Sequence, residues 1–566
     1  MEDLRMRLKK MTALGLAAVM GLSITACGGG NSGGNGSGAP AETTQAAAAE
    51  TTAEALPEGV ADTVSTRISR GDVAALEQEM VVSTHSSKDT LNVQLSGDPG
   101  TLFPYTKGAG NVTEIINREV CEPLFFHGYN FEIVPLLATS WEHPDELTYI
   151  FHLREGVKYS DGTDFVADDV KFSMQMNYDD TQLQQNVKSV DMDNVEIIDD
   201  YTIKIPLKEP DAYFMTELQG VAITKEETYK NSPDGFTEKP IGTGAYYVDE
   251  FVGGNRAVLK ANPNYWGGEP AIKTVTFKVI SDTAQRSIAL ETGEVDLLTE
   301  LSQQDYSRIE ADDRFNTIIR SGYKSDTLDF NCSENSICHD VKVRQAIAYA
   351  IDKAAIYAAV YQNKFGSIAT AYPSDGMIDY DPKWEEGGYY ATDLEKSKAL
   401  LKEAGIAEGT KITIINNGDK TYSSVAEIVQ AMLSQVGLNA EITSYERAVY
   451  NSIMDDAAGG WDIAFGSKTS PAGYVADMAH AYFEKAGINR CHYTNDEFNE
   501  WLLEAKKTED DSKRAEITDK IVKVLQEDVP SLAFHRQAIN YAWVKDLKGF
   551  NVYGQNNIRV KYLYFE

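Results

Sequence analysis

Residues 134–174 constrain the fold more than any other stretch, because strand and turn signals alternate there before a helix signal. Large apolar side chains occupy every second position of one run, at Tyr149, Phe151 and Leu153. This two-residue period is typical of a half-buried strand. Residues 143–146, which include a proline and two acids, predict a turn before that strand, and residues 160–162 predict a turn after it. Asp168 is placed to cap a following helix. The stretch therefore predicts two strands and a helix joined by tight turns.

The composition excludes some classes of protein before other motifs are considered. The chain has 566 residues, 42% of them hydrophobic, which is enough for one large core or several smaller ones. Its formal net charge is -34 at pH 7. Nucleic-acid binding relies on clustered lysine and arginine, so we expect no nucleic-acid partner.

The first 27 residues have the layout of a secretion signal. Basic residues precede an apolar run over residues 11–24, which is shorter than the roughly 20 residues that a membrane-spanning helix needs. The run ends in Ile24-Thr25-Ala26-Cys27, which resembles a bacterial lipobox. The resemblance implies a lipid on Cys27 and a protein held at a membrane. The alternative is ordinary cleavage after Ala26 with an incidental cysteine. Residues 28–85 predict a flexible tether, in which residues 56–80 have the spacing of a peripheral helix.

Strand and helix signals alternate through the rest of the chain. We expect strands at residues 91–95 and a hairpin over residues 195–207. Asp340 is placed to cap a helix, and a strand at residues 412–415 precedes a helix at 426–436 and a strand at 440–443. That order predicts a right-handed unit of two parallel strands and one helix. The fold class expected is therefore α/β.

Several motifs closely resemble the signature of the peptide/nickel-type (family five) solute-binding proteins of ABC importers. In residues 134–174 the matching residues are Pro135, Leu137, Ala138, Ser140, Trp141, Phe151, Leu153, Arg154, Gly156, Val157, Lys158, Asp161, Gly162, Phe165, Ala167, Asp169 and Val170. Further matches lie at residues 240–246, 262–268, 293–296 and 343–352. The glycine-rich match at 240–246 continues into an expected strand, whereas a phosphate-binding loop would lead into a helix, so we expect no nucleotide there.

The resemblance covers residues 89–566 and implies a fold and a function. It implies a two-lobe periplasmic-binding-protein-like fold (type II, with an extra subdomain) joined by a hinge. The first lobe would comprise residues 86–325 and 536–566, with the extra subdomain, and the second lobe residues 326–535. The implied function is that of the substrate-binding component of an ABC importer, outside the cytoplasmic membrane and anchored there by its lipid. It would capture a solute between the lobes and deliver it to a permease whose ATPase subunits supply the energy.

These motifs do not determine the ligand class. An oligopeptide or dipeptide is the first expectation from the family, and an oligosaccharide, a nickel chelate or another small anion are the alternatives. A surface sensor lipoprotein with the same fold is a further alternative. We expect no enzyme and no cofactor, because the chain contains neither His-Glu-x-x-His nor Cys-x-x-Cys and no convincing Ser/His/Asp motif.

Four cysteines remain if Cys27 is lipidated. Cys332 and Cys338 are close enough in sequence to close a small disulfide loop outside the cell. Free buried thiols are the equal alternative. A zinc site is a minor one, since only His339 is adjacent.

The segment 459–474 is the most informative about the ligand. A strand from Trp461 to Phe465 would deliver the following loop to the cleft. The resemblance implies that relatives carry an aspartate in this loop that pairs with the amino terminus of a peptide, whereas this chain has Ser470 there. A buried ammonium without a carboxylate partner is strongly disfavoured. Either another acid supplies the anchor, or the ligand is not a conventional free-amine peptide.

The candidate ligand-binding residues follow from this segment and from a stretch upstream of it. They are Arg447, Trp461, Ser467, Lys468, Ser470 and Tyr474. Arg447 and Lys468 have the charge to meet a ligand carboxylate or phosphate, with solvated surface charges as the alternative. Trp461 fits a place in the core better than a stacking contact with the ligand.

A first prediction follows for Lys468. If its ammonium anchors an anionic ligand, Lys468→Ala weakens binding ten-fold or more, about 1.4 kcal/mol. Calorimetric titration measures this, and unchanged affinity removes Lys468 from the site.

Overall fold

The computed structural model describes residues 82–83, 85–105, 110–128, 133–231, 235–386, 388–483, 489–553 and 558–566. All of them belong to one compact unit, Glu58–Glu566. The predicted signal peptide, the Cys27 lipidation site, the helix over residues 56–80 and nearly all of the tether lie outside the described residues.

Eleven of the described strands form one mixed sheet. Its order is β15 (Leu438–Ser444), β14 (Thr410–Asn416), β16 (Ile463–Thr469), β12 (Phe315–Phe330), β17 (Ser531–Val544), β11 (Leu297–Leu298), β1 (Thr90–Leu95), β10 (Thr274–Val279), β9 (Arg256–Ala261) and β8 (Tyr246–Val252), and β13 (Ser367–Ile368) also pairs with β17. Separate apolar clusters pack on the two ends of this order, one around β14 and β16 and the other around β1 and β10. The two lobes are thus two cores on one sheet.

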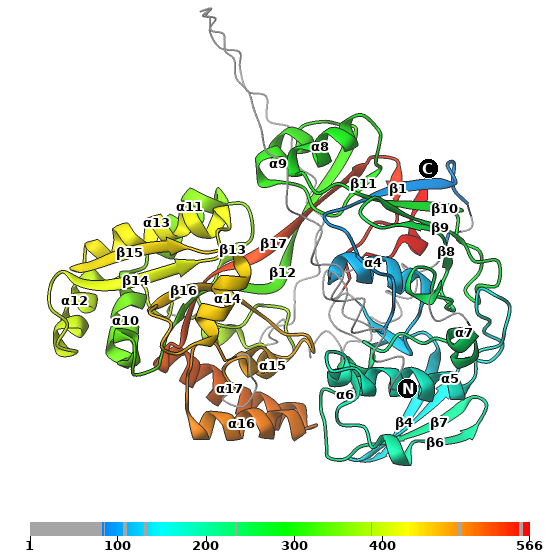
Figure 1. The fold of residues 1–566 in the computed structure, drawn as a ribbon, viewed down its shortest axis with the longest axis horizontal. Helices are drawn as coiled ribbons and strands as arrows, with labels where there is room; N and C mark the ends of the chain where they lie inside the picture. Colours follow the sequence, from blue (N-terminus) through cyan, green and yellow to red (C-terminus); the bar gives the residue numbers. More distant parts are fainter. Residues whose placement is uncertain are drawn as a thin grey trace, which may run out of the picture. The chain divides into compact units, whose positions relative to one another are not determined.

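Two long antiparallel strands, β12 and β17, join these two ends (Figure 1). Their pairing runs from Phe315 opposite Val544 to Asp329 opposite Ser531. The predicted lobe boundaries at residues 325/326 and 535/536 fall inside these two strands. Register shifts interrupt the pairing between Ser321 and Ser325 and again after Asp326. Such bulges bend a strand and change the direction of its side chains.

Helices pack on the sheet or on one another at both of its ends. On the side of the first lobe they are α4 (Asn111–Val120), α7 (Glu226–Asn231), α8 (Thr283–Glu291) and α9 (Gln303–Glu310). On the side of the second lobe they are α10 (Val341–Ala350), α11 (Lys353–Tyr361), α12 (Leu394–Glu403), α13 (Lys420–Ser434), α14 (Arg447–Asp455), α15 (Val475–Ala479), α16 (Asp496–Lys507) and α17 (Asp511–Asp528).

A smaller sheet forms the extra subdomain. Its order is β4 (Ala138–Asp145), β5 (Thr148–Leu153), β7 (Thr202–Pro206) and β6 (Glu196–Asp199), packed with α5 (Ala167–Asp179) and α6 (Phe214–Leu218) around an apolar cluster of its own. The helix and hairpin predicted here are confirmed. The turn predicted at residues 143–146 is shorter than expected, because β4 continues through Pro144 as far as Asp145. Proline has no backbone N–H to donate, and the pairing of β4 with β5 is irregular at this point, between Glu142 and Asp145.

The predicted cap of α5 is wrong. The helix follows Val166, and the carboxylate of Asp169, not that of Asp168, accepts a hydrogen bond from the Val166 N–H at 3.0 Å. The acid three residues into the helix thus reaches back to the cap, as in one half of a capping box.

The predicted parallel unit of the second lobe is confirmed, with β14 parallel to β15 and α13 between them in sequence. The helix begins at Lys420, six residues before the predicted start, because the Asp419 carboxylate caps it by accepting from the N–H groups of Thr421 and Tyr422. Asp340 caps α10 as predicted. The glycines of residues 240–246 pack against the backbone of Glu119 and Val120, and β8 follows them, so this motif is scaffold.

The extra subdomain also contacts the second lobe directly. The Lys506 ammonium of α16 lies 2.8 Å from Glu217 and 3.4 Å from Asp211, and the rings of Tyr213 and Tyr474 stack with centroids 4.4 Å apart. Burial raises the pKa of Glu217 to about 7, against the opposing effect of the nearby Lys506 charge. The Glu217 carboxyl group therefore takes up its proton at a higher pH in the folded protein than in the unfolded chain.

A pH dependence of stability follows from Glu217. Its pKa in the folded protein, about 7, lies above the ordinary value of 4.5, so the folded state binds more protons between these two pH values. Its contribution to the free energy of unfolding therefore falls as pH rises from about 4.5 to about 7. Relative to the wild type, Glu217→Gln should gain roughly 2 to 3 kcal/mol between pH 4.5 and pH 8. Urea unfolding at both pH values measures this, and parallel pH profiles of the two proteins contradict it.

Candidate functional site

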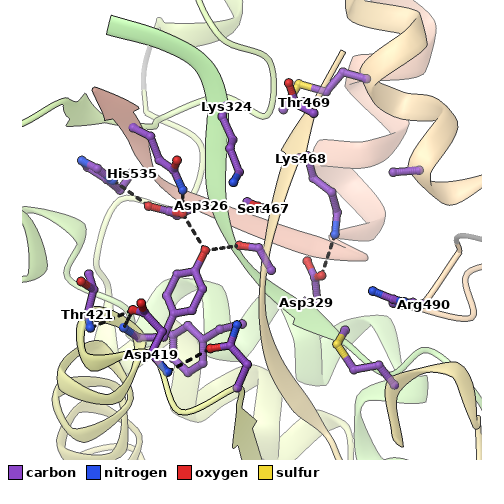
Figure 2. Close-up of a pocket in the computed structure, with 18 of the residues that line it drawn as sticks. Lys324, Asp326, Asp329, Asp419, Thr421, Ser467, Lys468, Thr469, Arg490 and His535 are labelled. Carbon is purple, nitrogen blue, oxygen red and sulfur yellow. Dashed lines mark hydrogen bonds and ion pairs between the residues drawn. The ribbon is translucent and has the colours of Figure 1, made fainter. Parts of the chain in front are cut away.

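A cavity of about 830 Å³ opens beside the strands that join the lobes. It is lined by β12, β16 and β17, by the first residues of α13, by one face of α14 and by the segment around α15. Gln185 of the extra subdomain also lines it. The walls are strongly polar, with two acids and a lysine from β12 and a histidine from β17 (Figure 2).

The edge of β16 lacks a strand partner where it lines the cavity, although the carbonyls of Phe465 and Gly466 accept hydrogen bonds from the hydroxyls of Tyr450 and Tyr422. β14 pairs with β16 only at Ile463 and Ala464, whereas β12 pairs with β16 as far as Thr469. From Phe465 onward, no described strand covers the other edge of β16. The predicted strand at residues 461–465 is therefore shifted, and Ser467 and Lys468 belong to the strand rather than to a loop. An uncovered edge offers main-chain donors and acceptors to a ligand.

A buried ion pair joins β16 to β12. The Lys468 ammonium lies 2.6 Å from Asp329 Oδ2, and the side chains are 11% and 2% exposed (Figure 2). Asp329 Oδ1 accepts further hydrogen bonds from the hydroxyls of Thr327 and Ser531. Burial alone would lower the pKa of Lys468, but the charge of Asp329 outweighs it and the pKa is raised. Lys468 is therefore a charged ammonium with its own partner, which argues against a free anchor for a ligand anion.

Glycine at position 466 makes room for this pair. A methyl group there would collide with the Asp329 carboxylate, which lies against the strand backbone. The carboxylate, its lysine and the glycine thus form one local arrangement on the cavity wall.

A second buried carboxylate, Asp326, organises the opposite face of β12. It accepts from Tyr422 Oη at 2.9 Å, from Gln537 Nε2 at 2.6 Å and from His535 Nδ1 at 2.8 Å. His535 Nε2 donates to the carbonyl of Phe365 at 2.8 Å. The His535 ring thus lies between the Asp326 carboxylate (Figure 2) and the Phe365 carbonyl.

The remaining cavity charges fall into two groups. Asp419 caps α13, Arg490 pairs with Asp455, and Glu300 pairs with Arg286. Lys324 and Arg447 also line the cavity, and among the described residues neither has an ion-pair or hydrogen-bond partner. Asp419 and Asp477 also lack a cation partner among the described residues, but each accepts hydrogen bonds from the protein. The charged cavity side chains without any described partner, Lys324 and Arg447, are positive.

The other residues predicted from the sequence lie in different places. Arg447, Ser467 and Lys468 line the cavity, whereas Trp461, Ser470 and Tyr474 do not. Trp461 is 1% exposed and packs in a small core, as the core interpretation predicted. Ser470 is buried and donates to Asp477 Oδ2 at 2.6 Å. Tyr474 packs on the extra subdomain, where its hydroxyl donates to the carbonyl of Ala212.

Most residues of this polar wall were not predicted from the sequence. The residues not singled out were Lys324, Asp326, Asp329, Asp419, Tyr422, Asp477, Arg490, His535 and Gln537. A weak signal did exist for Asp326 and Asp329, because they lie close to the apolar Leu328 and Phe330 and a buried acid requires a partner.

Comparisons with known proteins agree on one family. The model of the family described as "Bacterial extracellular solute-binding proteins, family 5 Middle" matches residues 132–490. The chain belongs to this family. It is 30% identical to the dipeptide-binding protein of Escherichia coli (strain K12), over 74% of this chain and 84% of that protein. Heme-binding protein A of Haemophilus influenzae is 27% identical, over 78% of this chain and 85% of that protein.

A solved structure supports the fold of this family member. HbpA2 from Haemophilus parasuis superposes with a TM-score of 0.74 at 26% identity, over 84% of this chain and 100% of that one. The family resemblance and the two-lobe α/β fold expected from the sequence are confirmed, and so is the substrate-binding role.

The four cysteines of this solute-binding protein that lie among the described residues, Cys121, Cys332, Cys338 and Cys491, are free thiols in the structure. This contradicts the disulfide between Cys332 and Cys338 and agrees with the alternative of buried thiols. Cys332 directs its sulfur to the Phe330 carbonyl, and Cys338 lies in the core of the second lobe. Burial raises the pKa of both thiols, that of Cys332 to about 11.

Two further findings concern metals and membranes. Among the described residues, no group of three or more His, Cys, Asp or Glu side chains is placed to hold a metal ion. The helices of that same part of the chain include none that is both long and apolar enough to cross a bilayer.

A stability prediction follows from the Lys468–Asp329 pair. Lys468→Met leaves Asp329 buried without its cation and should lower the free energy of unfolding by about 3 kcal/mol. The double variant Asp329→Asn/Lys468→Met removes both charges and should recover most of that loss. Urea unfolding measures both.

Lys411 is a matched control, because its partner Glu441 is 2.6 Å away but both side chains are more than half exposed. Lys411→Met should change stability by less than about 1 kcal/mol. Equal losses for Lys411→Met and Lys468→Met contradict the importance of the buried pair.

Proposed function

We propose that this solute-binding protein captures short peptides outside the cytoplasm and delivers them to the permease of an ABC importer. The observation that carries the ligand class is the unpaired edge of β16 beside a polar cavity. A peptide in extended conformation adds to such an edge by main-chain hydrogen bonds, whatever its side chains.

The volume and the polarity of the cavity favour a short peptide. About 830 Å³ lies within the usual range for enclosed small-molecule sites. One relative is named for dipeptide binding and another for heme binding. A large apolar macrocycle fits poorly on walls that carry Asp326, Asp329 and Lys468, whereas peptide groups are matched by them.

Delivery requires two states of the protein. The strands β12 and β17 are the described connections between the two ends of the sheet, and their bulges lie next to the cavity. A ligand that contacts both lobes favours the closed state by its differential affinity for that state. The permease would recognise the closed form, and its ATPase subunits would hydrolyse ATP.

Anchoring and location complete the proposal. Lipid on Cys27, followed by the tether, would hold the protein on the outer side of the cytoplasmic membrane; the lipobox-like residues 24–27 support this. The ligand would leave the protein chemically intact, because the role is transport and not turnover.

Ligand identification tests the proposal. Native mass spectrometry of the purified protein should show a co-purified species with the mass of a short peptide, and denaturation should release it. Calorimetric titration with free and N-blocked tripeptides should detect binding. Methylation of the central peptide nitrogen should weaken that binding ten-fold or more, because it removes a main-chain donor.

The contrary results are equally specific. A co-purified sugar, or no heat from any tripeptide, rules out the peptide class. Undiminished binding of the N-methylated peptide would mean that the edge of β16 is not used.

A further inference from the structure

We infer that Lys468 determines which ligand charges the site accepts. Its ammonium pairs with the Asp329 carboxylate on the cavity wall, so this carboxylate is not available to a ligand amine. The site therefore selects negatively charged solutes without a free amino group. Under the proposed function, on which the peptide part of this inference rests, the ligand class is an N-blocked short peptide with a free carboxylate. The inference starts from the pairing of charges in the cavity.

The acids of the cavity wall are largely committed to partners within the protein. Asp329 holds Lys468 and two hydroxyls, and Asp326 holds His535, Gln537 and tyrosine hydroxyls. A ligand ammonium that entered would lose its water and find Asp329 already neutralised by Lys468 and Asp326 already occupied by hydrogen-bond partners. It would also approach the positive charge of Lys468 itself. Lys468 thus takes the place of a ligand amino group.

The bases of the cavity are committed to a lesser extent. Lys324 lies on β12 directly opposite Thr469 of β16, and Arg447 begins α14. Among the described residues these two side chains lack a charged partner, so a ligand carboxylate would supply one. The arrangement accepts a negative end and offers little to a positive one.

Asp419, the cap of α13, lines the cavity without a cation partner among the described residues, and Asp477 is the second acid that competes with this inference. Its Oδ2 accepts from Ser470 Oγ at 2.6 Å and from the Ala472 N–H at 3.0 Å, which fixes the segment after β16. Its side chain is only partly buried and lines the cavity. A ligand ammonium placed on Asp477 would overturn the inference, and the experiment below includes that outcome.

Three peptides of nearly the same shape test the inference by calorimetric titration. Gly-Ala-Ala has both charges, N-acetyl-Ala-Ala lacks only the ammonium, and Gly-Ala-Ala amide lacks only the carboxylate. We expect N-acetyl-Ala-Ala to bind at least ten-fold more tightly than Gly-Ala-Ala, and the amide to bind most weakly. Equal or tighter binding of Gly-Ala-Ala overturns the inference, and loss of that binding in Asp477→Asn would locate the amine.

Variants of the pair make the test sharper. Lys468→Met exposes the Asp329 carboxylate to the ligand, so this variant should bind Gly-Ala-Ala more tightly than N-acetyl-Ala-Ala. Asp329→Asn/Lys468→Met removes both charges and should show no gain for the amine. It also serves as the second variant if Lys468→Met folds poorly. Unchanged selectivity in both variants contradicts the role of Lys468.

The roles of Arg447 and Lys324 in binding a ligand carboxylate can be tested separately. Arg447→Gln and Lys324→Gln should weaken N-acetyl-Ala-Ala several-fold and leave the amide unaffected. Lys342→Gln is the matched control, because Lys342 pairs with Glu403 and does not line the cavity. An equal effect of Lys342→Gln, or none from the other two, contradicts the inference.

Failure of the proposed function would look different. If none of the three peptides binds, the peptide class is wrong, and thermal stabilisation by organic acids and amines of matched size decides the charge preference. Stabilisation by the acids alone supports the inference, whereas stabilisation by the amines, or by no acid, overturns it.

Discussion

The antiparallel pairing of β12 with β17 is the constraint on which the rest of the structure depends. These two strands come from distant parts of the chain and carry the sheet from the core of the second lobe to that of the first. Between Ser321 and Ser325 three residues of β12 face a single residue of β17. A bulge of this kind changes which way the following side chains point. The charged residues of the cavity follow directly after it, so the connection between the lobes and the binding wall are built from the same few residues.

The two acids of β12 show how this wall tolerates burial. Asp326 and Asp329 are three positions apart and therefore lie on opposite faces of the strand. Asp326 meets the imidazole of His535 from β17, Asp329 meets the ammonium of Lys468 from β16, and each acid accepts additional hydrogen bonds from side-chain donors. A buried carboxylate is tolerated only with such partners. The wall is therefore pre-organised before any ligand enters, and the partners of these acids restrict which charges a ligand can bring.

Much of the fold could be predicted because it depends on local patterns. The hairpins of the extra subdomain, the parallel unit of the second lobe and the caps at Asp340 follow from periodicity and capping chemistry. The errors share a cause: the Asp168 cap, the start of α13 and the end of β16 all lie where the apolar pattern is weak and polar contacts decide. The site was harder still. Nothing in the spacing of Asp329 and Lys468, 139 positions apart, predicts their ion pair. Their pairing depends on the register of β12 against β16, which is a tertiary property.

The overall charge of the chain bears on where specificity resides. A net charge of -34 repels an anion at long range, yet the charged cavity side chains without any described partner, Lys324 and Arg447, are positive. At physiological ionic strength charges farther apart than about 8 Å are largely screened in water. The acidic surface therefore affects the approach of a solute more than its affinity, and selection falls to contacts within the cavity. There the unpaired edge of β16 can form hydrogen bonds with the main chain of a ligand, and the Lys468–Asp329 pair discriminates between ligand charges. Main-chain hydrogen bonds form with peptides of many different side chains. A preference for particular charges at the two ends of the ligand is compatible with this tolerance and still gives selectivity.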